Sequence, residues 1–324
     1  MANIKLSFAS GLYDRMLPLF TGDVKPKGIN LEFVRVDSPR EIFDRMAGGN
    51  AFDVSEFSCS EFIARHAHGD RGFVAIPVFP SRVFRHGMIS INTKHIKSPK
   101  DFEGKRIGVP LYTMTAALFI KGLLQRDHGV DLSGITWVQG SINGEGSHGN
   151  PTVMPLVKPV KIETKPHGKT LSDLLETGEI SAIIGTTLPN AIRTNPDIAR
   201  LFPDYREIEK DYYRRTKIFP TMHLVAIRRD VYEKNPEIAQ SLYEAFCKSK
   251  DLALEKMRYI GALRYMLPWM TADLDEIDDV FGGDPWPYGL EVNRPSLEAL
   301  NQYMEDQFLI EKKVRIDDLF VVKG

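Results

Sequence analysis

The chain has 324 residues, of which 43% are hydrophobic, and it carries 42 Lys and Arg against 43 Asp and Glu. This is the composition of a globular protein and excludes the disordered and fibrous classes. A net charge of −1 gives no general attraction to nucleic acid or to an anionic membrane, so we expect neither as a partner. The length suggests two lobes, each large enough to bury its own core.

The sequence also suggests a compartment. No run approaches the ~18 consecutive apolar residues of a membrane span. Asp14 and Arg15 interrupt the apolar residues near the N-terminus, where a signal peptide would have an unbroken apolar stretch. Two cysteines, Cys59 and Cys247, are too few for a disulfide framework or a four-thiolate zinc site. We therefore expect a cytoplasmic protein with two free thiols.

The first part of the chain predicts short strands that alternate with amphipathic helices, which is the pattern of βαβ units. Its last two strands lie too close together for a helix between them, so the first unit is expected to end there. The expected strands are residues 4–10, 31–36, 52–57, 73–79 and 87–92, and the expected helices are residues 13–19, 39–47 and 60–68.

A second unit of the same kind follows. Between its elements, residues 140–168 hold five Gly and four Pro and predict a long loop. Such a loop in a compact α/β protein is either functional or evidence against the assignment. The strands are expected at residues 105–110, 135–139 and 180–185, and the helices at residues 115–129 and 170–178.

The pattern changes after residue 195. A strand is expected at residues 222–231 and a long helix at residues 236–257, and the rest of the chain is expected to be helical. The chain is expected to cross between the two units near residues 92–99 and again near residues 211–221.

Two crossings between two wound units predict an α/β fold with two lobes. Each lobe would be a wound mixed sheet flanked by helices, with the ligand in a cleft between the lobes at the carboxyl ends of the strands. The first lobe would comprise residues 1–94 and 217–324, and the second lobe residues 95–216.

Several long segments of unusual composition, among them FDVSEFSCSEFIARH and NGEGSHGNP, resemble the 4,5-dihydroxyphthalate decarboxylase family. The resemblance implies a fold like that of the type II periplasmic binding proteins in an intracellular enzyme, which agrees with the two lobes inferred above. The segments span nearly the whole chain and comprise residues 52–66, 76–87, 104–122, 143–151, 217–243, 266–270 and 284–294.

The resemblance also implies a reaction, the non-oxidative decarboxylation of 4,5-dihydroxyphthalate to 3,4-dihydroxybenzoate without an organic cofactor. One hydroxyl of this substrate lies para to the departing carboxylate. Polarising that hydroxyl pushes electron density onto the ring carbon, which a general acid protonates before carbon dioxide leaves. The site therefore needs proton carriers and groups that hold carboxylates, such as Arg side chains or helix N-terminal amides.

Cationic and hydroxyl side chains beside predicted strands are the candidate carboxylate ligands. Arg82 and Arg85 would each bind a carboxylate with a guanidinium fork, unless one of them pairs with an acid such as Glu56 for structure. Thr113 and Thr115 lie between a strand and a helix, where one of them could be an ordinary N-cap. The expected substrate-binding set is completed by Tyr13, Arg15, Ser58 and Glu145.

Three histidines and one glutamate are the candidate proton carriers. His86 adjoins the two arginines, and His148 lies in the Gly-rich loop, which would be a lid over the cleft or a solvated insertion. His223 begins a strand near the second crossing, where it faces the cleft or packs in the core. Glu56 would carry a proton or form a structural salt bridge. Which histidine acts as acid or base is left open.

The sequence has no HExxH motif, no Cys and His cluster with zinc spacing and no phosphate-binding loop, so we expect no cofactor and assign no metal-binding residue. Whether a divalent ion assists is left open. Self-association into a homo-oligomer is left open. The alternative function is a binding protein that captures an aromatic acid for a transporter, and the expected lack of a signal peptide argues against it. A third is an enzyme like the pyrimidine synthase of thiamine biosynthesis, whose Cys-rich motif is missing here.

Overall fold

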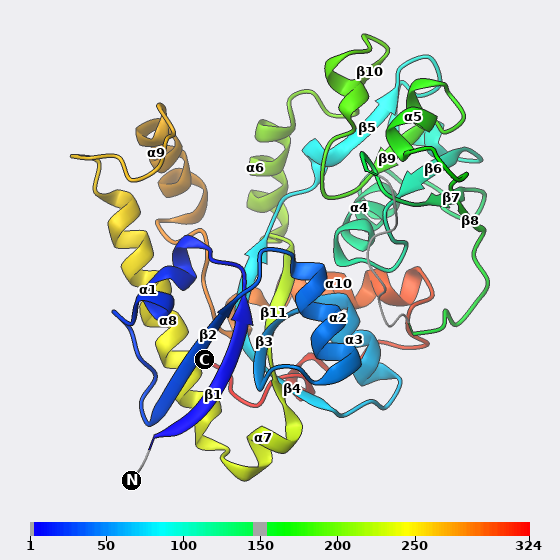
Figure 1. The fold of residues 1–324 in the computed structure, drawn as a ribbon. Coiled ribbons are helices and arrows are strands. Elements are labelled where there is room, and N and C mark those ends of the chain that lie inside the picture. The colour runs from blue at the N-terminus through cyan, green and yellow to red at the C-terminus, as the bar shows by residue number, and fades with distance from the viewer. Residues whose placement is uncertain (1–2, 145–153) are drawn as a thin grey trace.

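The computed structural model describes residues 3–144 and 154–324, and the fold is built on two mixed β-sheets (Figure 1). In the first sheet, with the order β2-β1-β3-β11-β4, β1 pairs in parallel with β2 and β3, and β11 is antiparallel to β3 and β4. Its strands are β1 (Ile4–Ser10), β2 (Ile29–Arg35), β3 (Val54–Ser58), β4 (Phe73–Arg82) and β11 (Thr221–Arg228).

The second sheet has the order β10-β5-β9-β6-β7-β8. Strands β9, β6, β7 and β8 are parallel, and β5 and β10 add an antiparallel edge. The strands are β5 (Ile89–Asn92), β6 (Arg106–Val109), β7 (Thr136–Gln139), β8 (Ile162–Thr164), β9 (Ala182–Ile184) and β10 (Ile198–Arg200).

Helices flank both sheets (Figure 1). The last of them, α10, lies between α4 of the second lobe and α3 of the first lobe and contacts both. The α-helices are α1 (Leu17–Thr21), α2 (Pro39–Gly49), α3 (Cys59–Ala67), α4 (Thr115–Arg126), α5 (Leu171–Glu176), α6 (Tyr205–Thr216), α7 (Arg229–Lys234), α8 (Glu237–Arg258), α9 (Met270–Phe281) and α10 (Leu290–Asp306).

The predicted two-lobed α/β fold is confirmed, and each strand expected from the sequence is present with its ends displaced by a few residues. Two short strands were not expected. All three residues of β8 are exposed, so its sequence lacks the apolar alternation that identifies a strand. Strand β10 has only three residues. Both are edge strands of the second sheet.

The chain passes between the sheets at places that differ in part from the expected ones. It leaves the first sheet after Arg82 and enters the second at Ile89, earlier than residues 92–99, because β5 pairs with β9 and β10. It returns between Arg200 and Thr221, through α6. The lobe boundaries at residues 94 and 216 stay a prediction.

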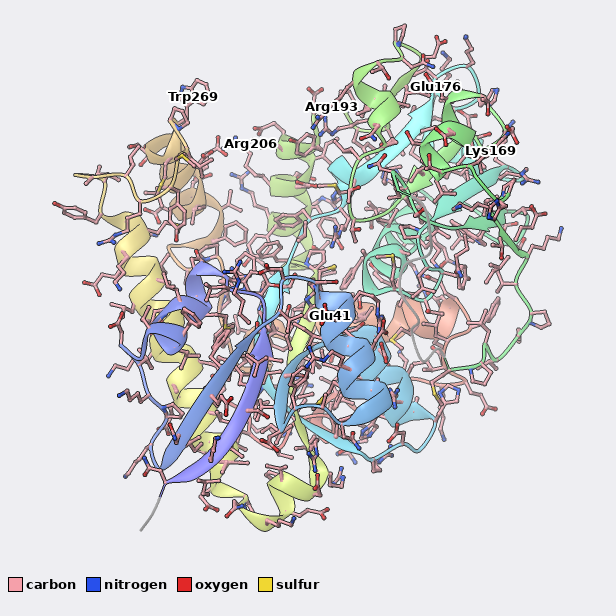
Figure 2. The ribbon with its side chains drawn as sticks, in the orientation of Figure 1. Glu41, Lys169, Glu176, Arg193, Arg206 and Trp269 are labelled. Carbon is pink, nitrogen blue, oxygen red and sulfur yellow. The ribbon has the colours of Figure 1, made fainter. Side chains whose placement is uncertain are left out.

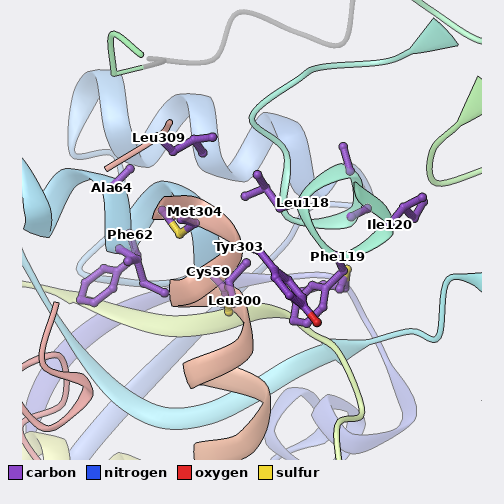
Figure 3. Packing of buried hydrophobic residues seen from close by; sticks show 14 of the residues in the cluster. Cys59, Phe62, Ala64, Leu118, Phe119, Ile120, Leu300, Tyr303, Met304 and Leu309 are labelled. Atoms are coloured by element: carbon purple, nitrogen blue, oxygen red, sulfur yellow. The ribbon is translucent and has the colours of Figure 1, made fainter. Parts of the chain in front are cut away.

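A shared apolar core joins the lobes where α3, α4 and α10 meet (Figure 3). Phe62 of α3, Phe119 of α4 and Met304 of α10 belong to one cluster of buried side chains. The rings of Phe119 and Tyr303 pack edge to face with their centroids 5.8 Å apart. Gly122 of α4 allows this approach, because a Cβ there would overlap the Tyr303 ring. The packing holds the beginnings of α3 and α4 close together.

None of the helices within the two described ranges is long and apolar enough to span a membrane.

Candidate functional site

A cavity of about 690 Å³ lies between the two lobes. The first lobe contributes the beginning of α2, the end of β3 with the beginning of α3, and residues of β4 and β11. The second lobe contributes the segment from β6 to α4 and Thr186, which follows β9. Glu41, labelled in Figure 2, belongs to the wall on the side of α2. The cavity thus lies where strands end, as the sequence predicted for the cleft.

Two helices from different lobes begin at this cavity. Ser58 is the N-cap of α3, and its Oγ accepts a hydrogen bond of 3.4 Å from the backbone N–H of Glu61. Helix α4 begins at Thr115 after Met114, whose side chain makes no capping hydrogen bond. The dipole of a helix N-terminus favours an anion, and so do those of its first N–H groups that have no acceptor. The cavity therefore has two walls suited to a carboxylate.

Hydroxyl groups connect the two helix N-termini. Thr115 Oγ1 donates a hydrogen bond of 3.0 Å to Ser60 Oγ and accepts one of 3.2 Å from the backbone N–H of Ser60. Ser60 Oγ in turn donates to the backbone oxygen of Thr113 at 3.0 Å. Ser58 Oγ lies 3.2 Å from Thr115 Oγ1. Of the predicted ligands, Ser58, Thr113 and Thr115 are thus brought together at one wall of the cavity.

Arg85 supplies a buried positive charge to the same cavity. Its side chain is 7% exposed and lines the cavity, and it forms no hydrogen bond or ion pair with any residue in the ranges 3–144 and 154–324. Burial lowers the pKa of the guanidinium to about 10, and the charge of Glu209 acts in the opposite direction. Arg85 therefore stays cationic at neutral pH, and no carboxylate among the described residues forms an ion pair with it.

Arg82 has different surroundings. It donates hydrogen bonds to the backbone oxygens of Pro287 at 2.7 Å and Phe219 at 3.4 Å, and to the side-chain oxygen of Asn293. Burial lowers its pKa to about 10, and it is not among the described residues that line the cavity. Its guanidinium therefore ties β4 to α10 and to the segment that precedes α10.

The partly buried His223 and the fully buried Glu56 form a pair at the cavity. His223 lines the cavity, and its Nδ1 lies 2.5 Å from Oε1 of Glu56. The pair forms because β11 is antiparallel to β3, with His223 opposite Ser58 and Val225 opposite Glu56. The pairing of β11 with β4 is irregular on both sides of His223, and such irregularities re-aim side chains. Phe43 packs against the imidazole with a centroid distance of 4.9 Å.

Glu56 is completely buried and has four hydrogen-bond donors. Burial alone would raise its pKa, but the hydrogen bond and charge of His223 and the hydroxyls of Ser10 and Tyr13 outweigh burial and hold the pKa below its ordinary value. Ser10 Oγ and the Tyr13 hydroxyl each donate at 2.9 Å, and the N–H of Gly11 donates at 3.4 Å. Because the carboxylate accepts, Nδ1 of His223 carries the proton of that hydrogen bond.

Tyr13 and Arg15 stand behind this pair, and neither is among the described residues that line the cavity. Burial, with the charge and hydrogen bond of Glu56, raises the pKa of Tyr13, so its hydroxyl stays a donor. Arg15 donates to the backbone oxygen of Pro80 at 2.6 Å and pairs with Asp14 at 3.0 Å. The guanidinium of Arg15 lies 4.4 Å from the ring centre of Tyr13.

The remaining predicted residues are not brought to this site. His86 is buried, with Nδ1 3.7 Å from Oε1 of Glu209 and with the rings of Phe202 and Tyr212 beside it. It is absent from the described wall of the cavity. Glu145 and His148 lie outside the residues that the structure describes.

Several polar residues of the cavity were not predicted as ligands, among them Ser60, Ser81, Thr186 and Arg40. Ser60 was considered only as a helix cap, and Ser81 lies within β4. Thr186 follows β9, and its place after the carboxyl end of a strand was a usable signal. Arg40, in the first turn of α2, is paired with Asp44 at 2.6 Å and with Glu61 at 3.3 Å.

No group of three or more His, Cys, Asp or Glu side chains in the described part of the chain is arranged so that it could hold a metal ion.

Solved structures of similar fold include periplasmic binding proteins. A putative sulfonate-binding protein from Methylobacillus flagellatus is 14% identical, with a TM-score of 0.54 over 99% of this chain and 92% of that chain. The aliphatic sulphonate binding protein from Escherichia coli is 13% identical, with a TM-score of 0.53 over 99% of this chain and 97% of that chain. These likenesses show the fold.

Relatives of higher identity are enzymes. A 4,5-dihydroxyphthalate decarboxylase from Comamonas testosteroni is 35% identical over 95% of this chain and 91% of its own length. A 4,5-dihydroxyphthalate decarboxylase from Pseudomonas putida is 38% identical over 66% of this chain and 83% of its own length. No protein-family model matches the chain. The chain therefore belongs to the family of the 4,5-dihydroxyphthalate decarboxylases and is a carboxy-lyase.

Proposed function

We propose that this protein converts 4,5-dihydroxyphthalate to 3,4-dihydroxybenzoate and carbon dioxide in the cavity between its lobes. The two named relatives support the substrate. The observation that carries the proposal is the buried cation of Arg85, which has no hydrogen-bond or ion-pair partner in the described part of the chain, in the same cavity as the imidazole of His223. An anion-binding group and a proton carrier are the two things that the reaction requires.

Binding of the substrate uses the groups that favour negative charge. Arg85 holds one carboxylate, because a buried guanidinium without a protein partner gains most from a bidentate anion. The N-termini of α3 and α4 and the hydroxyls of Ser58 and Thr115 hold the other carboxylate. Because these groups come from both lobes, the ring is oriented only when the lobes stand together.

The chemical step replaces a carboxylate by a proton on the same ring carbon. The hydroxyl para to that carbon donates electron density, a proton adds to the carbon, and the carbon–carboxylate bond then breaks to release carbon dioxide. The electron pair of that bond restores the aromatic ring. One proton is consumed for each molecule of carbon dioxide released.

His223 is the proton carrier in this proposal, and Glu56 positions it. The Glu56 carboxylate binds Nδ1 of His223, which leaves Nε2 to exchange a proton with the substrate. The carboxylate also stabilises the charge that the ring gains whenever Nε2 is protonated. Ser10, Gly11 and Tyr13 hold Glu56 ionised and immobile through their hydrogen bonds.

The test is to incubate the purified protein with 4,5-dihydroxyphthalate and to measure carbon dioxide release together with the ring absorbance. Phthalate is the matched control, because it has both carboxylates but no para hydroxyl. We expect one carbon dioxide per 4,5-dihydroxyphthalate and none from phthalate. Saturable binding of 4,5-dihydroxyphthalate without turnover, or equal turnover of both compounds, would contradict the proposal.

A further inference from the structure

A second cavity of about 300 Å³ lies beside the segments that connect the two sheets. Phe84 comes from the segment between β4 and β5, and Phe219 from the segment between α6 and β11. Helices α8 and α9 form the opposite wall through residues such as Ala253 and Phe281. Its described wall shares no residue with the wall of the first cavity.

Flat aromatic faces make up much of this second cavity. The rings of Phe84 and Phe219 are stacked, with centroids 4.5 Å apart and an interplanar angle of 21°. Phe219 also meets Trp286 edge to face at 5.4 Å and Phe281 at 5.7 Å. The N–H of the Trp286 indole is already bonded to the backbone oxygen of Phe79 at 2.9 Å. The rings therefore offer faces and edges, which suit a planar aromatic ligand.

The charged side chains of this wall are already paired with protein groups. Arg15 pairs with Asp14 at 3.0 Å, and its guanidinium lies 4.4 Å from the Trp286 ring centre. Lys250 pairs with Asp284, and Asp284 accepts a hydrogen bond of 2.8 Å from the backbone N–H of Trp286. The two cations and two carboxylates balance. This differs from the first cavity, where Arg85 has no such partner among the residues that the structure describes.

We infer that the second cavity is a binding site for an uncharged planar aromatic compound of one or two rings, such as a phenol or a naphthol. Its volume admits such a molecule, and its rings provide stacking partners. A charged ligand gains nothing from the wall, because binding it would require one of the existing ion pairs to be broken or its charge to be left buried without a partner. The inference does not depend on the substrate proposed for the first cavity.

The test is isothermal titration calorimetry of the full chain with 2-naphthol. Ala253→Phe fills the second cavity from α8, because Ala253 is buried in its wall. The matched control is Ala262→Phe, which adds the same ring at an exposed position between α8 and α9. We expect saturable binding by the wild type and by Ala262→Phe, and loss of binding by Ala253→Phe.

A second variant covers the case in which Ala253→Phe does not fold, which is checked by its urea unfolding curve. Phe281→Leu keeps an apolar wall but removes one ring face, and we expect about 3- to 10-fold weaker binding of 2-naphthol. Absence of binding by the wild type would overturn the inference. If Ala253→Phe folds and binds 2-naphthol with unchanged affinity, the ligand binds elsewhere and the inference is wrong. If Ala253→Phe does not fold, unchanged affinity in Phe281→Leu leads to the same conclusion.

Discussion

Arg82 and Arg85 are three positions apart and both buried, yet the structure surrounds them differently. Arg82 is bonded to protein oxygens on three residues, whereas the guanidinium of Arg85 has no hydrogen bond or ion pair within the described ranges. A buried cation without a partner is costly unless a ligand supplies one. Arg82 therefore contributes to the stability of the fold, whereas Arg85 is available to bind a ligand.

The first prediction compares alanine variants of the two arginines. Arg85→Ala removes the proposed carboxylate clamp, so we expect KM for 4,5-dihydroxyphthalate to rise about 30-fold or more, with little change in the urea midpoint. Arg82→Ala leaves the side-chain oxygen of Asn293 without its Arg82 donor and removes one of two donors from the backbone oxygens of Pro287 and Phe219. We therefore expect the free energy of unfolding to fall by about 2–4 kcal/mol. An unchanged KM in Arg85→Ala would show that Arg85 does not bind a carboxylate of the substrate.

The second prediction concerns the positioning of His223. Glu56→Gln keeps the shape of the side chain but loses the charge that orients the imidazole, so we expect kcat to fall by about 100-fold or more with a smaller change in KM. Asp53→Asn is the matched control, because Asp53 lies just before the same strand and bonds Ser7 instead. Equal losses of kcat in the two variants would indicate a general structural effect.

The third prediction is a pH dependence of stability that Glu56 causes. Its pKa in the folded protein lies below the ordinary value of 4.5, so its contribution is complete above that value and is lost as the pH falls through the folded pKa. We expect the free energy of unfolding of the wild type to fall more steeply below about pH 4.5 than that of Glu56→Gln. Urea titrations over this range measure both slopes, and identical slopes would contradict the assignment.

At the level of single residues, the sequence could predict which segments carry ligands but not which side chains point inward. Thr113, Thr115 and Ser58 were found because helices begin after strands there. Arg82 and Arg85 could not be separated, since their difference depends on Asn293 and Phe219, which are far away in the sequence. The pairing of Glu56 with His223 likewise depends on the register of β11 against β3.

At the level of elements, the contact of α4 with α10 fixes the geometry of the site. It holds the N-terminus of α4 against that of α3, which the hydroxyls of Ser60 and Thr115 then join. The sequence predicted α4 from its apolar pattern, but the partner that packs on it is α10, more than 160 residues later. The periodicity of apolar residues predicts which face of a helix is buried, but it does not predict which other element packs against that face.

The fourth prediction tests this contact. Gly122→Ala introduces a Cβ that overlaps the ring of Tyr303, so we expect the free energy of unfolding to fall by about 1–3 kcal/mol. The matched control is Gly48→Ala in α2, where nothing lies near the added Cβ, and there we expect a gain of about 0.5–1 kcal/mol from helix propensity. A stabilised Gly122→Ala would show that α10 is not packed closely on α4.

At the level of the whole molecule, the candidate active site exists only because two lobes meet. The alternation of strands and helices was enough to predict two wound units and a cleft, and the fold confirms this. The residues that line the cavity were harder to predict, because they come from distant parts of the chain. Arg85 lies between β4 and β5, His223 lies in β11, and Thr186 follows β9 of the second sheet. Such a set of residues is defined by topology.

The most direct test of the central claim is the turnover number of His223→Asn with 4,5-dihydroxyphthalate, measured as carbon dioxide released per chain. His86→Asn is the matched control, since His86 is buried away from the described wall of the cavity. We expect a loss of about 100-fold or more in kcat for His223→Asn, with substrate binding retained, and near wild-type turnover for His86→Asn. Near wild-type turnover by His223→Asn would show that His223 is not the proton carrier.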